Sequence, residues 1–108
     1  MGAPGEQVDV EPQRVAELHR AGAVQLIDVR EQYEWDAGHL DGARHLALDR
    51  LAAEAQTIDR DRAVVFYCAV GSRSTMAAQA FRGAGFEAYS MAGGIERWGA
   101  EGLPVAHG

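Results

Sequence analysis

The chain has 108 residues, of which 47% are hydrophobic and 24% are charged, and its formal net charge is -6. That length fits one domain whose hydrophobic core is large enough to fold without disulfides or metals. Because the acidic residues are spread along the chain and no basic stripe is present, we do not expect nucleic acid as a partner. No segment approaches the roughly 20 apolar residues that span a bilayer, so we do not expect a membrane either. All ten cationic residues are arginines, which excludes lysine Schiff-base chemistry.

Cys68 is the only cysteine, so the chain can form no internal disulfide. A lone thiol suits a reducing compartment, and residues 1–6 lack the basic and apolar runs of a secretion signal, so we expect a cytoplasmic protein. For a small acidic domain of this kind we expect a monomer. One cysteine and four scattered histidines lack the spacing of a zinc site, and no metal is expected. We interpret residues 1–6 as a loose tail and residues 7–106 as a single domain.

Strands and helices alternate along the chain. In order, the patterns predict a strand at 8–10, a helix from Pro12 to Gly22, a strand at 24–29, a helix at 30–37, a weak strand at 43–46, a helix at 48–55, a strand at 63–67, a helix at 74–83, a strand at 88–91 and a helix at 95–100. In the helix at 74–83, the apolar residues at helical spacing are Met76, Ala77, Ala80 and Phe81. This alternation predicts an α/β fold, a mainly parallel five-stranded sheet with helices on both faces.

Cys68 directly follows the clearest strand, at 63–67, and a small, hydroxyl-bearing turn leads from it into the next helix. Ligands of parallel sheets bind beyond the carboxyl ends of strands, and a helix amino terminus stabilises an anion. The dipole alone lowers a thiol pKa by about one unit or less. Backbone amides that converge on sulfur, hydroxyls from Ser72, Ser74 and Thr75, and the cation of Arg73 would add to this effect. We therefore predict a depressed pKa for Cys68; the alternative interpretation is a buried, inert thiol.

Three separated blocks resemble the single-domain rhodanese family. The first covers residues 26–31, 34–35 and 38–43, and reads LIDVRE, EW and GHLDGA. The second, at 68–74, reads CAVGSRS and is similar to the C-x-x-G-x-R-S loop of the family. The third comprises GGI at 93–95, Trp98 and GLPV at 102–105. The resemblance extends over most of residues 8–105 and implies the rhodanese-like fold.

The resemblance implies a sulfurtransferase in which Cys68 is the catalytic nucleophile. Its thiolate would take the outer sulfur of a small anionic donor such as thiosulfate, and a nucleophilic acceptor, cyanide or a thiol, would then remove that sulfur from the persulfide. The acceptor could be a thiol protein, and no cofactor is required. The binding loop that this family pattern implies consists of Ala69, Val70, Gly71, Ser72, Arg73 and Ser74. Two departures stand out: Asp41 replaces a frequent proline, and Ala69 and Val70 are apolar.

Residues outside the loop are candidates for support of the pocket or loop. Asp28 ends a strand, and Arg30 and Glu34 stand at i,i+4 spacing, which suggests a structural ion pair or brace. Trp35 could line the pocket mouth or lie in the core, whereas His39 is interpreted as structural. Gly93 and Gly94 would form a turn beside the catalytic loop.

Two other functions fit the same residues. A cysteine-dependent phosphatase or arsenate reductase uses Cys and Arg in an anion loop, but such phosphatase loops have five residues between them, and this chain has four. A shorter loop encloses a smaller ligand, which favours a terminal sulfur over a phosphoryl group. A persulfide carrier or adaptor would need the same loop as an enzyme, and the sequence does not separate the two.

Overall fold

The structure is a computed structural model that describes residues 7–107, so the interpretation of residues 1–6 as a tail lies outside the described residues. Its centre is a five-stranded sheet of order β1-β5-β4-β2-β3, in which every pairing between strands is parallel. The strands are β1 (Asp9–Val10), β2 (Val24–Asp28), β3 (Arg44–His45), β4 (Ala63–Tyr67) and β5 (Ala88–Met91). The helices are α1 (Pro12–Arg20), α2 (Gln32–Ala37), α3 (Leu51–Glu54), α4 (Ser72–Gly83) and α5 (Gly94–Ala100). The predicted α/β class is confirmed.

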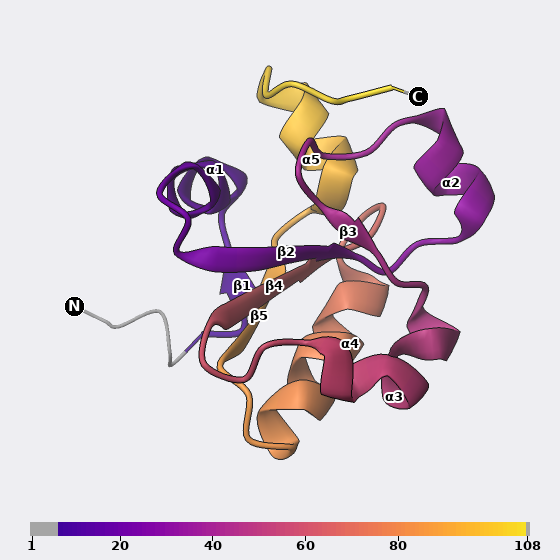
Figure 1. Ribbon diagram of the computed structural model, residues 1–108. Coiled ribbons are helices and arrows are strands. Elements are labelled where there is room, and N and C mark those ends of the chain that lie inside the picture. The colour runs from indigo at the N-terminus through magenta and orange to yellow at the C-terminus, as the bar shows by residue number, and fades with distance from the viewer. Residues whose placement is uncertain (1–6, 108) are drawn as a thin grey trace.

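Helices cover both faces of this sheet, with α1 and α5 on one side and α3 and α4 on the other (Figure 1). Alternate residues of the central strand β4 supply the two cores. Val64 and Phe66 pack in the cluster that includes Phe81 of α4, whereas Val65 and Tyr67 pack with residues of α1 and α5. Because β4 is buried on both faces, its sequence is an unbroken apolar run. Among residues 7–107, no helix is long and apolar enough to cross a bilayer.

All five helices differ from their predicted bounds, but α1 and α5 only by one or two residues, since α1 ends at Arg20 and α5 begins at Gly94. The helix expected at 30–37 begins at Gln32, because Glu31 is its N-cap and forms a capping box with Glu34. The helix expected at 48–55 is a short α-helix between two 3-10 turns, Leu48–Arg50 and Ala55–Thr57.

Helix α4 also differs from its prediction, in both its start and its buried face. It begins at Ser72 instead of 74, and its buried side chains are Ser74, Ala77, Ala78 and Phe81. Met76 is 58% exposed and Ala80 is exposed too, so only Ala77 and Phe81 of the four apolar residues at helical spacing are buried. The buried face of the first turn is polar because it faces Cys68 and not the hydrophobic core.

A buried ion pair ties the end of β2 to the loop that follows it. Arg30 donates to both carboxylate oxygens of Asp28, with Nη2 2.7 Å from Oδ2, and its Nη2 also donates to the Gly38 carbonyl at 2.7 Å. The suggested i,i+4 pair of Arg30 with Glu34 was therefore wrong, because Arg30 lies before the helix begins. Burial and the Asp28 carboxylate raise the pKa of the neighbouring Tyr67, whose hydroxyl accepts from the Leu40 amide.

Asp28→Asn should destabilise the protein by about 3 kcal/mol, since it leaves the buried Arg30 without its counter-charge. Urea unfolding measures this loss. The control is Glu17→Gln, which breaks the exposed Arg14–Glu17 pair and should change stability by less than about 1 kcal/mol. Equal effects of the two substitutions would contradict the structural importance of the Asp28–Arg30 pair.

Candidate active site

Cys68 lies at the turn from β4 into α4, and the chain curls so that backbone amides approach its sulfur. The amide of Gly71 donates to Cys68 Sγ at 3.1 Å and that of Ser74 at 3.4 Å, while Ser74 Oγ lies 3.5 Å from Sγ. Gly71 is the N-cap of α4 with φ of 110°, a conformation that glycine adopts without strain. The sulfur therefore occupies an anion-binding position at a helix amino terminus.

Two opposing effects set the pKa of the Cys68 thiol. Burial, which raises a thiol pKa, is the largest single effect. Hydrogen bonds from the Ser74 hydroxyl and from the backbone amides of the loop together outweigh burial, so the pKa of Cys68 lies below its ordinary value. The direction is the one that the sequence predicts, and its main cause is hydrogen bonding to sulfur.

The first turn of α5 supports the loop from the other side. The amide of Ile95 donates to the Cys68 carbonyl at 2.9 Å, and that of Glu96 donates to the Ala69 carbonyl at 3.1 Å. Gly94, with φ of 62°, lies so close to the loop that an added Cβ would be 2.3 Å from the Ala69 oxygen. Gly93 also has a positive φ, of 73°. Both glycines therefore lie beside the loop, as predicted, and at Gly94 the two backbones approach too closely for any side chain.

Arg73, the only cation in the loop, is held by a carboxylate from another helix. Its Nη1 and Nη2 donate to Oε1 and Oε2 of Glu34 in α2, at 2.8 and 3.0 Å. This hydrogen-bonded pair lowers the pKa of Glu34 to about 2, so the carboxylate is charged at neutral pH. An electrostatic interaction with Cys68 contributes to the raised pKa of Arg73. The guanidinium therefore interacts electrostatically with the thiol, although the Glu34 carboxylate balances most of its positive charge.

The remaining predicted residues lie at different distances from this chemistry. Ser72 and Val70 are exposed, and Ala69 is half-buried. The Asp28–Arg30 pair braces the loop after β2, where the Arg30 guanidinium donates to Asp28 and to the Gly38 carbonyl. Trp35 is half-buried and is not part of the core. Its ring stacks on the rings of two histidines, with centroid separations of 3.6 Å to His39 and 5.1 Å to His45.

Sequence reasoning missed two residues at the site. Glu34 was paired with Arg30, although its partner is Arg73, 39 residues away. Ser90 received no role, yet its Oγ lies 2.7 Å from Ser74 Oγ and it is 0% exposed. One signal could have revealed it, since Ser90 is the one serine in a short strand whose other residues are an alanine, a tyrosine and a methionine.

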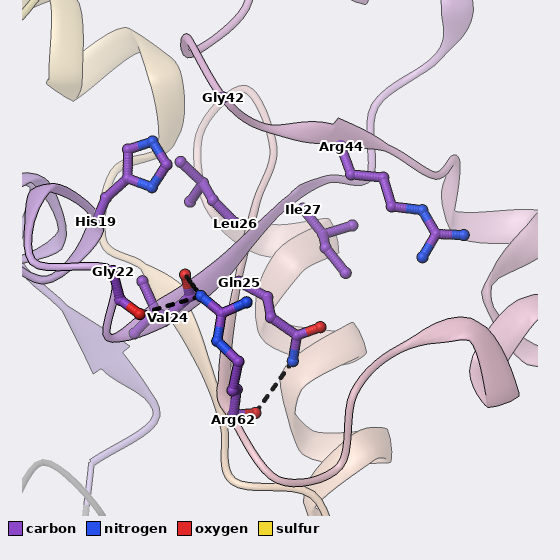
Figure 2. Close-up of a pocket in the computed structure, with 9 residues that line it drawn as sticks. All are labelled: His19, Gly22, Val24, Gln25, Leu26, Ile27, Gly42, Arg44 and Arg62. Carbon is purple, nitrogen blue, oxygen red and sulfur yellow. Dashed lines mark hydrogen bonds between the residues drawn. The ribbon is translucent and has the colours of Figure 1, made fainter.

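A pocket along β2 is separate from this site (Figure 2). It extends from Val24 to Ile27, and no residue of the Cys68 loop lines it. Arg62 donates to the carbonyls of Gly22 and Val24 at 3.1 Å each, as two dashed lines show. Because this guanidinium is already bonded within the protein, the pocket does not provide it as a free anion-binding group. The lining residues are His19, Gly22, Val24, Gln25, Leu26, Ile27, Gly42, Arg44 and Arg62.

Gly94→Ala should displace the loop, because the new methyl group would overlap the carbonyls of Cys68 and Ala69 at a positive φ. We expect a lower unfolding midpoint in urea and a higher pKa of Cys68 in a thiolate titration. The matched control is Gly99→Ala in the same helix, where an added Cβ meets nothing within 4 Å and should be neutral or stabilising. Equal behaviour of both variants would contradict the importance of this close approach.

Comparisons with known proteins agree with this geometry. The family described as Rhodanese-like domain matches residues 11–101. The chain is 37% identical over 90 residues to the thiosulfate sulfurtransferase GlpE of Ectopseudomonas mendocina, covering 82% of each protein. It is 43% identical over 86 residues to the uncharacterized protein YqhL of Bacillus subtilis, covering 77% of this chain and 68% of YqhL. A rhodanese-related protein from Thermoplasma volcanium superimposes with a TM-score of 0.85 at 26% identity, over 91% of this chain and 96% of that one. The fold, the cysteine loop and these similarities together establish that the chain belongs to the rhodanese-like family.

Proposed function

We propose that this member of the sulfurtransferase family transfers a sulfane sulfur from a small donor such as thiosulfate to a nucleophilic acceptor through a persulfide on Cys68. The observation that carries the proposal is the convergence of the Gly71 and Ser74 amides on a sulfur whose pKa is lowered. A thiolate, and not a thiol, is the nucleophile in such chemistry. The similarity to a thiosulfate sulfurtransferase supports the choice of donor.

Sulfur transfer takes place in two displacements. The Cys68 thiolate attacks the outer sulfur of thiosulfate, a new sulfur–sulfur bond forms, and sulfite leaves with the electron pair of the bond that breaks. The negative charge then lies on the outer sulfur of the persulfide, where amides of the loop can stabilise it. Cyanide or a thiolate attacks that sulfur and restores the Cys68 thiolate. Because Cys68 is 0% exposed, we infer that the loop moves to admit the donor.

A reducing compartment such as the cytoplasm suits this chemistry, because the single thiol of the chain must stay free to receive sulfur. The proposed acceptors are cyanide in an assay and a thiol, small or carried by a protein, in the cell. Their identity sets whether the protein works mainly as an enzyme or as a sulfur carrier, two roles that use the same displacements at Cys68.

Incubation of the protein with thiosulfate should add one sulfur atom at Cys68, seen by intact mass spectrometry, because the activated thiolate attacks the donor. Cyanide should then remove that atom and yield thiocyanate. Cys68→Ser is the control and should show neither event. If thiosulfate, mercaptopyruvate and a protein persulfide all left the mass unchanged, the sulfurtransferase proposal would fail, and hydrolysis of an aryl phosphate would be the next assay.

Glu34→Gln should raise kcat/KM for thiosulfate by about threefold to tenfold, since it removes the charge that balances Arg73 and exposes a cation to a dianionic donor. Reaction with a neutral organic trisulfide should change little. The control is Asp36→Asn in the same helix, which removes an equal charge from a carboxylate that accepts from Gln32. An equal fall for both donors in Glu34→Gln would show that Glu34 serves to shape the loop.

A further inference from the structure

Three hydroxyl groups form a connected chain behind the sulfur of Cys68. Ser74 Oγ lies 3.5 Å from Cys68 Sγ and 2.7 Å from Ser90 Oγ, and Thr75 Oγ1 donates to Ser90 Oγ at 3.3 Å. Ser74 and Ser90 are both 0% exposed, so their hydroxyls must find partners inside the protein. Ser90 pairs with Phe66 in the sheet, two residues before Cys68, which places Ser90 and Cys68 on the same face.

Each hydroxyl of this hydroxyl chain has only one hydrogen to donate, which limits the directions that its hydrogen bonds can take. When Thr75 donates to Ser90 Oγ at 3.3 Å, and not to Asp9 Oδ1 at 3.4 Å, the hydrogen of Ser90 is available to Ser74. With Ser90 as donor, the hydrogen of Ser74 is left with two acceptors, Cys68 Sγ and the Gly71 carbonyl at 3.2 Å. A thiolate attracts that hydrogen more strongly than a neutral carbonyl does.

We propose that Ser90 is a positioning residue for the nucleophile: by donating to Ser74, it directs the hydroxyl hydrogen of Ser74 at Cys68 Sγ and stabilises the thiolate. Ser90 acts on sulfur through Ser74, since connected hydrogen bonds in a buried site polarise one another. This inference rests on the proposed function and deepens it, because it concerns what activates the same thiol.

The charged groups near the hydroxyl chain must stay unchanged in a test of how that chain affects the Cys68 thiolate. Arg73 of α4 interacts electrostatically with Cys68, and Glu34 of α2 holds that guanidinium. Asp9 of β1 is a second acceptor for the hydrogen of Thr75, with Oγ1 and Oδ1 3.4 Å apart. Ser90→Ala changes none of these groups, so a change in the pKa of Cys68 would report on the hydroxyl chain itself.

The test is a thiolate titration by ultraviolet absorbance, together with the pH dependence of alkylation by iodoacetamide. In Ser90→Ala we expect the pKa of Cys68 to rise by about 0.5, so that below the pKa the alkylation rate falls about threefold. Thr75→Val, which removes only the outer donor, should give a smaller rise. Ser90→Thr keeps the hydroxyl and should behave like the wild type. Thr57→Val removes an exposed hydroxyl elsewhere and is the matched control.

An unchanged pKa in folded Ser90→Ala would overturn the proposal even if sulfur transfer slowed, because that result would mean a role in packing alone. A Ser90→Thr variant that titrates like Ser90→Ala would also overturn it. If Ser90→Ala does not fold, the titration is made on Thr75→Val, a substitution at a half-buried position. An unchanged pKa of Cys68 in that variant would then overturn the proposal. Alkylation needs no sulfur donor, so the proposal can fail while sulfur transfer holds, and the reverse.

Discussion

The close approach of two backbone segments, residues 68–71 and the first turn of α5, is the constraint on which the site depends. Amides of α5 donate to the carbonyls of Cys68 and Ala69, while the amides of Gly71 and Ser74 donate to the sulfur. Gly94 permits the approach because any side chain there would overlap the loop. Strand β4, which is buried on both faces, holds Cys68 at the carboxyl end of the sheet.

Hydrogen bonding, and not net charge, is what makes this site favourable for an anion. The one arginine in the loop is balanced by Glu34, and the thiol is fully buried, which by itself disfavours a thiolate. Donors from the loop and from the first turn of α4 reverse that penalty. Such a site has little long-range attraction for anions and stabilises negative charge mainly at the sulfur. The Gly71 and Ser74 amides point at Cys68 Sγ, the atom on which a thiolate carries its charge.

Polar residues of distant segments complete the loop. Glu34 reaches it from α2, whose start is set by a capping box, and Ser90 reaches it from β5. The Asp28–Arg30 pair orders the segment that connects β2 to α2, the helix that contains Glu34. Thus Asp28 and Arg30 form a structural ion pair, and the carboxylate that contacts the Cys68 loop is Glu34.

The sequence by itself determined the α/β class, the β4 and β5 bounds and the location of the cysteine loop, because apolar periodicity, glycine and a lone cysteine are local signals. The same local reasoning misplaced Glu34 and overlooked Ser90. Only the tertiary structure decided those partners: Glu34 and Arg73 are 39 residues apart, and Ser74 and Ser90 are 16 apart. Parallel strands are joined by long crossover connections, which bring residues that are far apart in the sequence into contact. The spacing of residues within one helix or strand does not indicate which of these distant residues will meet.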